Sequence, residues 1–239
     1  MNSKIKKILK KKNKSKIICL TSYSKNIAEE ADKYADIILV GDSLGSVLYN
    51  YDTTRKVTLT NMIDHSKSVR LGTKKSLMVV DMPHNTYASK NLALKNAKKI
   101  IKETKCDAVK LEGGKKIASI IKYLVNKGIP VMGHIGLLPQ TDTSFKLKGR
   151  NINQSKKIID DAISVTKSGA FALVIECVVE SLARKITKSI SIPTIGIGAS
   201  KSCDGQILVV DDLLGLTDFS AKFVKRYSNL RKTIDKSIK

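Results

Sequence analysis

Acidic residues stand near the ends of three short apolar runs that follow one another along the chain. Adjacent parallel strands lie about 4.8 Å apart, so three such strand ends can bring their side chains to one ion. Carboxylate oxygens suit Mg²⁺, whereas zinc favours nitrogen and sulfur. The pattern predicts a magnesium site, and the alternative is that each acid caps a helix or pairs with a lysine. The acids are Asp42, Asp81 and Glu112, in the runs 37–43, 77–83 and 108–113.

A lysine accompanies the third acid. Lys110 precedes Glu112 by two residues, so both side chains face the same side of a strand. A lysine beside a cation site is unfavourable unless an anion lies between the two charges. We therefore expect Lys110 to bind a substrate carboxylate, with a salt bridge to one of the acids as the alternative.

Glu176 is a candidate proton acceptor, and His134 is a candidate substrate-binding residue. Glu176 lies in the apolar stretch 174–178, which disfavours its ionised form and would suit a proton acceptor. A buried ion-pair partner is the alternative for Glu176. His134 is one of three histidines. We assign it to substrate binding, with a hydrogen-bonded structural role as the alternative.

The elements that must position these groups are eight apolar runs of strand length. They are near-continuous in Val, Ile and Leu, which is typical of parallel strands covered on the outside. Segments with helical spacing separate most of them, and eight such units in 239 residues favour a closed (β/α)8 barrel over an open sheet. The predicted strands are 16–22, 37–43, 77–83, 108–113, 130–136, 172–178, 193–199 and 206–210, and the predicted helices include 27–35, 93–102, 117–125, 158–165 and 182–190.

The barrel has consequences for the site and for the domain organisation. Active sites of such barrels lie at the C-terminal ends of the strands, where the candidate residues stand. Only residues 200–205 separate the last two predicted strands, too few for a crossover helix. We expect residues 17–239 to form a single (β/α)8 domain. Residues 1–16 are a lysine-rich segment, either a helix packed across one end of the fold or a disordered lead.

Composition restricts the partners. The net charge of +23 raises the possibility of nucleic acid, but the lysines fall mainly on polar faces of predicted helices without interleaved aromatic residues. We therefore expect no nucleic-acid partner, and small anionic substrates would be favoured. No apolar run of about 18 residues and no secretory signal is visible, so we expect a cytoplasmic protein without a membrane segment. The four cysteines are too widely spaced for a zinc knuckle.

The chain resembles the ketopantoate hydroxymethyltransferase family from about residue 17 to residue 230. The resemblance depends on eight ordered motifs, and Asp42, Asp81, Lys110, Glu112 and Glu176 lie inside them. The motifs are 40–45 (VGDSLG), 80–83 (VDMP), 109–114 (VKLEGG), 130–137 (PVMGHIGL), 176–178 (ECV), 193–199 (PTIGIGA), 203–206 (CDGQ) and 222–227 (KFVKRY).

The resemblance implies a (β/α)8 TIM barrel of the phosphoenolpyruvate mutase/isocitrate lyase superfamily, assembled as a homodecamer. It implies transfer of a hydroxymethyl group from 5,10-methylenetetrahydrofolate to 3-methyl-2-oxobutanoate, giving 2-dehydropantoate for pantothenate and coenzyme A biosynthesis through a Mg²⁺-stabilised enolate. Position by position, Asp42, Asp81 and Glu112 match the Mg²⁺ ligands, and the two aspartates also contact substrate. Ser43 and Lys110 match substrate-binding positions, and Glu176 matches the proton acceptor.

Two other functions remain open at this point. One is a carbon–carbon lyase or mutase of the same superfamily acting on another 2-oxo acid, against which Glu176 and the motif 110–114 argue. The other is a basic, non-catalytic protein that binds nucleic acid or a partner subunit. The second predicts RNA binding that survives replacement of the acids.

Overall fold

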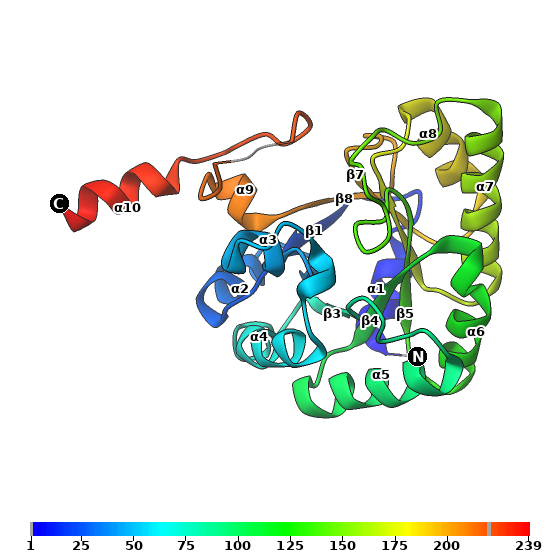
Figure 1. Cartoon of the computed structure of the whole chain (residues 1–239), viewed down its shortest axis with the longest axis horizontal. Coiled ribbons are helices and arrows are strands. Elements are labelled where there is room, and N and C mark those ends of the chain that lie inside the picture. Colours follow the sequence, from blue (N-terminus) through cyan, green and yellow to red (C-terminus); the bar gives the residue numbers. More distant parts are fainter. Residues whose placement is uncertain (1, 219–220) are drawn as a thin grey trace.

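The eight apolar runs form eight parallel strands that close into a barrel, β1 to β8 in chain order (Figure 1). The computed structural model describes residues 2–218 and 221–239. Each strand pairs with the next, and β8 pairs with β1. The predicted barrel is therefore confirmed, including its eighth strand. The strands are β1 Ile17–Thr21, β2 Ile37–Val40, β3 Leu77–Asp81, β4 Ala108–Glu112, β5 Val131–Gly136, β6 Ala172–Glu176, β7 Thr194–Ile197 and β8 Gly205–Leu208.

Helices cover the outside of the barrel (Figure 1). Successive helices α4 to α8 pack against one another around it, and α2 packs against α4. No helix joins β7 to β8 in the described chain, as the short connection predicts. The helices are α1 Ser3–Lys10, α2 Lys25–Ala31, α3 Leu44–Tyr49, α4 Leu59–Gly72, α5 Lys90–Thr104, α6 Ala118–Asn126, α7 Ile152–Lys167, α8 Glu180–Ser189, α9 Val210–Leu214 and α10 Leu230–Ile238, with 3₁₀ turns η1 Thr54–Lys56 and η2 Gly114–Ile117.

The alternation of side chains along each strand divides the core in two. In β2, Ile38 and Val40 belong to the apolar layer between strands and helices, whereas Ile37 and Leu39 belong to the cluster inside the barrel. In β4, Val109 and Leu111 likewise belong to the outer layer. Because successive side chains of a strand point to opposite faces, Lys110 and Glu112 face the barrel interior.

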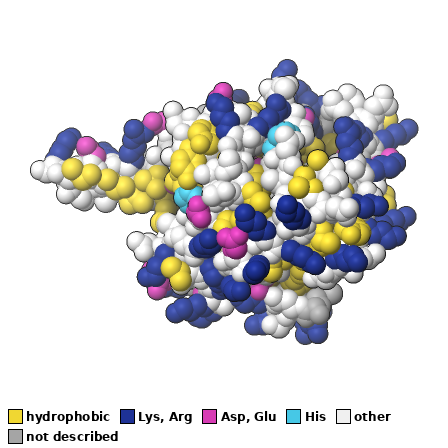
Figure 2. Space-filling view, turned by 60° about the horizontal axis from the view of Figure 1, so that its bottom comes forward, with side chains coloured by type: hydrophobic (Ala, Val, Ile, Leu, Met, Phe, Trp, Pro, Cys, Tyr) yellow, Lys and Arg dark blue, Asp and Glu magenta, His cyan; other side chains and the backbone are white. Residues whose placement is uncertain are grey.

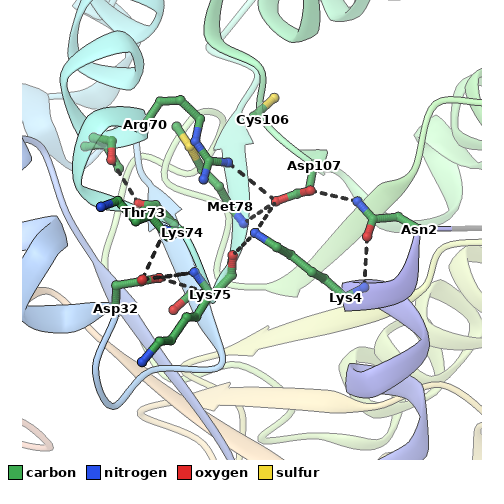
Figure 3. Close-up of polar contacts among 12 residues, drawn as sticks. Asn2, Lys4, Asp32, Arg70, Thr73, Lys74, Lys75, Met78, Cys106 and Asp107 are labelled. Carbon is green, nitrogen blue, oxygen red and sulfur yellow. Dashed lines mark hydrogen bonds and ion pairs between the residues drawn. The ribbon is translucent and has the colours of Figure 1, made fainter.

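Helix α1 closes the N-terminal end of the barrel. Ile5 and Ile8 are buried in the inner cluster. Asn2 donates to Asp107 Oδ1 at 2.7 Å, and Lys4 donates to the carbonyl oxygen of Ser76 at 2.8 Å (Figure 3). Of the two alternatives for the lysine-rich start, the structure has the helix packed across one end.

Helix α2 ends four residues before the end of the stretch 27–35, whose spacing predicted a helix. Its last residue is Ala31, and the side chain of Asp32 turns away to accept hydrogen bonds from the backbone N–H groups of Lys74, Lys75 and Ser76 (Figure 3). The prediction for residues 27–35 was therefore too long. The Asp32 carboxylate stabilises the loop before β3, whereas in a longer helix it would lie on the helix surface.

The last helix departs from the rest of the molecule. In Figure 1, α10 projects away from the barrel, and none of its residues is buried.

Among the residues described, no helix combines the length and the apolar character needed to cross a bilayer. Lysine and arginine side chains are scattered over the face in Figure 2, without a single concentrated patch.

Candidate active site

All seven predicted site residues line one cavity of about 110 Å³ at the C-terminal end of the barrel. β3, β4, β5 and β6 supply most of them from inward-facing positions in their C-terminal halves, and the turn after β2 supplies the others. Because these strands are neighbours in the barrel, their ends meet at one place. The residues are Asp42, Ser43, Asp81, Lys110, Glu112, His134 and Glu176.

Lys110 and Asp81 form a buried ion pair in this cavity. The Lys110 Nζ atom lies 2.7 Å from Asp81 Oδ1, and both side chains are almost fully buried. Asp81 Oδ2 accepts a hydrogen bond from the backbone N–H of Asp42 at 3.1 Å. The salt bridge that the sequence left open as an alternative is thus present, and it holds the lysine at the cavity.

His134 lies between two carboxylates. Its Nδ1 atom is 3.4 Å from Glu112 Oε2 and its Nε2 atom is 3.2 Å from Glu176 Oε2. Burial and the Lys110 ammonium lower the pKa of His134, but the two glutamates outweigh them and raise it to about 9. Among the described residues neither ring nitrogen makes an aligned hydrogen bond, so these contacts are ion pairs at close range.

Gln140 is a site residue that the sequence did not indicate. Its Nε2 atom donates to Asp42 Oδ2 at 2.8 Å, and its backbone N–H donates to Glu112 Oε1 at 2.7 Å. Arg55 fixes this loop by donating from Nε to the Gln140 carbonyl oxygen at 2.9 Å. A glutamine after a proline in an irregular loop carries no periodic signal, and its contacts come from residues distant in the chain.

Tyr23 is a second residue without a sequence signal. Its hydroxyl group lies 2.8 Å from Ser43 Oγ, at the edge of the cavity. The glycines of the stretch 193–199 behave differently. Gly198, with φ of 57°, lies against the ring of Phe223, and neither it nor Gly196 lines the cavity.

The carboxylates form a donor set that suits a hard cation. Burial and the charge of Asp81 raise the pKa of Asp42 to about 8, because Lys110 compensates only part of the negative charge. Gln140 or Lys110 holds one oxygen of each of these carboxylates; of the other oxygens, Asp81 Oδ2 accepts from the backbone N–H of Asp42 and Glu112 Oε2 lies 3.4 Å from His134 Nδ1. The described acids, histidines and cysteines do not form a closed three-ligand cluster. Mg²⁺ needs no such cluster, because it retains water molecules beside one or two carboxylates.

The fold and the position of the site define a class of protein, the (β/α)8 barrels with a cavity at the C-terminal ends of the strands. A solved structure of 2,3-dimethylmalate lyase, which is a member of the phosphoenolpyruvate mutase/isocitrate lyase superfamily, has a similar fold, with a TM-score of 0.62 at 13% identity, covering 87% of this chain and 79% of the other. Phosphonopyruvate hydrolase, solved with oxalate and Mg²⁺, matches with a TM-score of 0.66 at 8% identity over 87% and 81% of the two chains.

Sequence comparison narrows this class to one family. The profile of the ketopantoate hydroxymethyltransferase family matches residues 2–239, and the chain belongs to that family of enzymes. The 3-methyl-2-oxobutanoate hydroxymethyltransferase of Pelagibacter ubique is 62% identical over 98% of this chain and 91% of its own length. The enzyme of the same name from Rhizobium etli is 52% identical over 91% and 82%.

Proposed function

We propose that this protein transfers a hydroxymethyl group from 5,10-methylenetetrahydrofolate to 3-methyl-2-oxobutanoate, giving 2-dehydropantoate in the pathway to pantothenate and coenzyme A. The observation that carries the proposal is the convergence of three acids, one lysine and Glu176 on one small cavity. The relatives of 50 to 62% identity that carry this activity in their names support the choice of substrate.

Lys110 binds the carboxylate of the 2-oxo acid in this proposal. Its ammonium group is held at the cavity by Asp81, so it is positioned before substrate arrives. Ser43, oriented by the Tyr23 hydroxyl, contributes a second hydrogen bond to the same substrate. A charge-assisted contact to a buried carboxylate is stronger than a neutral hydrogen bond, so Lys110 contributes most to orientation.

Glu176 accepts the proton from C3 of the substrate. It lines the cavity, and its Oε2 atom lies 3.2 Å from His134 Nε2. The His134 ring holds this carboxylate in place through that contact, so His134 acts on Glu176 and also borders the substrate. Proton transfer by a positioned side chain contributes roughly 10²- to 10⁴-fold to rate.

Asp42, Asp81 and Glu112 would hold Mg²⁺. When bound, the ion would supply Lewis acidity beside the 2-oxo group and stabilise the negative charge of the enolate. The three carboxylates fit this role because they are oxygen donors, are buried and are only partly neutralised by Lys110. Gln140 keeps Asp42 and Glu112 in place through its two hydrogen bonds.

The reaction balances with one water molecule. Carbon three of the enolate forms a bond to the methylene carbon of the folate, and the bonds from that carbon to the folate nitrogens break. Water supplies the hydroxyl group, and tetrahydrofolate leaves.

We further propose that the protein is a homo-oligomer, as a decamer, and that it is cytoplasmic. The four free cysteines support the cytoplasmic location.

Hydrogen–deuterium exchange at C3 of 3-methyl-2-oxobutanoate, followed by NMR in D₂O without folate, tests the proposal. We expect exchange that needs Mg²⁺, stops when the metal is chelated and falls at least 100-fold in Glu176→Gln. Glu180→Gln, a change at an exposed residue at the start of α8, is the matched control. Exchange at the uncatalysed rate in the intact protein would contradict the proposal.

A further inference from the structure

An arginine at the surface joins two segments that both line the catalytic cavity. Arg55 lies in the 3₁₀ turn η1, and its neighbour Thr54 is buried and lines the cavity. The loop after β5 contributes Pro139 to the same cavity, and Gln140 follows Pro139. Arg55 and Gln140 are 85 residues apart in the chain, so tertiary contacts must hold the two segments together.

The Arg55 guanidinium group binds the backbone of that loop at three successive carbonyl oxygens. Its Nε atom donates to the Gln140 carbonyl oxygen at 2.9 Å. Its Nη2 atom donates to the carbonyl oxygens of Thr141 at 2.9 Å and of Asp142 at 3.4 Å. A guanidinium group presents its donors in a fixed planar fork, so it holds several acceptors at once, which the single ammonium group of a lysine does less well.

The inner side of the loop holds two of the acids. The backbone N–H of Gln140 donates to Glu112 Oε1 at 2.7 Å, and its Nε2 atom donates to Asp42 Oδ2 at 2.8 Å. Gln140 is only 2% exposed, so water cannot easily replace these contacts. One residue of the loop therefore connects carboxylates that come from two different parts of the barrel.

Two further contacts fix which end of the Gln140 amide meets Asp42. The Nε2 atom also donates to the Met82 carbonyl oxygen at 3.0 Å, and the Tyr87 hydroxyl donates to Oε1 at 2.6 Å. Because a carbonyl oxygen is only an acceptor, the amide cannot turn its own oxygen toward Met82. The amide thus presents an N–H group to Asp42 Oδ2 and leaves Asp42 Oδ1 available to a cation.

We propose that Arg55 is a positioning residue for the cation site: from the surface it holds Gln140, and Gln140 holds Asp42 and Glu112. This inference rests on the proposed function, in which these acids hold Mg²⁺, and adds a residue that contacts neither the ion nor the substrate. The hydrogen-bond partners of ligating groups typically contribute about 10- to 100-fold to metal affinity. Gln140 is such a partner, and Arg55 acts one step further from the ion.

Binding of Mn²⁺ in the absence of substrate, followed by electron paramagnetic resonance of the free ion, tests the role of Arg55. Arg55→Met removes a positive charge, so electrostatics alone would leave cation binding unchanged or make it tighter. We expect the opposite, roughly three- to tenfold weaker binding, because the loop loses its three hydrogen bonds to Arg55. The matched control is Lys56→Met, which removes the same charge from the next residue, whose ammonium group contacts Asp52. The control should bind Mn²⁺ like the wild type, and unfolding temperatures verify that both variants fold.

Gln140→Leu tests whether Arg55 acts through Gln140. This change should weaken Mn²⁺ binding by roughly 10- to 100-fold. Adding Arg55→Met to it should then cost less affinity than Arg55→Met does in the wild type, because residues in one network of contacts are not additive. Arg55→Lys keeps the charge but cannot span three carbonyl oxygens, so its affinity should lie between those of the wild type and Arg55→Met.

Three results would overturn the inference: wild-type Mn²⁺ affinity in Arg55→Met, an equal loss in Lys56→Met, or fully additive effects of Arg55→Met and Gln140→Leu. C3 exchange in the intact protein separates this inference from the proposed function. If Mg²⁺-dependent exchange occurs and Arg55→Met binds Mn²⁺ normally, only the role of Arg55 is wrong. If the intact protein binds no Mn²⁺ and shows no exchange, the proposed function and the role of Arg55 are both wrong.

Discussion

Buried charges at the mouth of the barrel determine what the individual residues can do. Four carboxylates line the catalytic cavity, and the described cations that line it with them are Lys110 and the protonated His134. Lys110 is 7% exposed, so water contributes little to screening its pair with Asp81. A divalent cation would neutralise the remaining negative charge of the cavity, and the substrate carboxylate would bind the Lys110 ammonium group.

Replacing Lys110 by methionine tests this balance between the carboxylates and the cations of the cavity. The change removes one partner of a buried pair, which costs about 3–5 kcal/mol of unfolding free energy. Mg²⁺ should then raise the unfolding temperature of Lys110→Met more than that of the wild type, because the carboxylates have lost their competing cation. Thermal and denaturant unfolding with and without Mg²⁺ measure both effects. Lys99→Met, at an exposed position of α5, is the control, and equal stability of the two variants would contradict the argument.

The site residues that the sequence could predict lie on strands or directly after one. Lys110 and Glu112 follow from the period of two together with the rule that barrel sites lie at strand ends, and the structure places both in the cavity. Gln140 could not be found in this way. Its position depends on Arg55, 85 residues earlier, and a contact between two irregular segments leaves no pattern in the sequence.

At the scale of elements, the strands were the most predictable part. A buried parallel strand is apolar on both faces, as β2 is throughout and β3 is up to Asp81 at its end, so its sequence is distinctive. Helix α1 was harder, because in its lysine-rich sequence only Ile5 and Ile8, with the partly buried Leu9, make the apolar contact with the barrel. The end of α2 was missed because Asp32 serves a loop that is distant in sequence.

Asp32 is expected to stabilise the entry into β3. Its carboxylate accepts hydrogen bonds from three successive backbone N–H groups, those of Lys74, Lys75 and Ser76. In Asp32→Ala these donors, of which that of Ser76 is buried, lose their partner, so the unfolding free energy should fall by about 1–3 kcal/mol. Urea denaturation at pH 7 measures the change. The control is Asp64→Ala at an exposed position of α4, which should change stability by less than about 0.5 kcal/mol.

The same contacts give this stabilisation a pH dependence. Burial raises the pKa of Asp32, but the hydrogen bonds from Ser76, Lys75 and Lys74 outweigh it and hold the pKa below its usual value. A carboxyl whose pKa is lower in the folded state stabilises fully above its unfolded pKa of about 3.9 and loses that contribution as pH falls through the folded value. The stability difference between wild type and Asp32→Asn should therefore shrink below about pH 4. A difference that stays constant down to pH 3 would show that the charge of Asp32 is unimportant.

At the scale of the whole molecule, α10 is an exception to the packing seen elsewhere. The helix begins after its N-cap Asn229 and has no buried residue, although Ile234 and Ile238 share one face four residues apart. A band of hydrophobic side chains runs along the projecting arm in Figure 2. An apolar stripe that meets nothing in its own chain is costly in water, and a second copy of the chain would cover it in the proposed homo-oligomer.

The stripe gives the oligomer proposal a direct test. Ile234→Glu with Ile238→Glu places two charges on the apolar face and should reduce the assembly to smaller species, because an uncompensated carboxylate in an interface is strongly unfavourable. Lys232→Glu with Lys236→Glu adds carboxylates two residues away along the same helix and should leave the assembly intact. Light scattering on a sizing column measures the masses of both variants and of the wild type. A monomeric wild type would contradict the homo-oligomer itself. An unchanged mass of the Ile234/Ile238 variant would show that the copies meet through another surface.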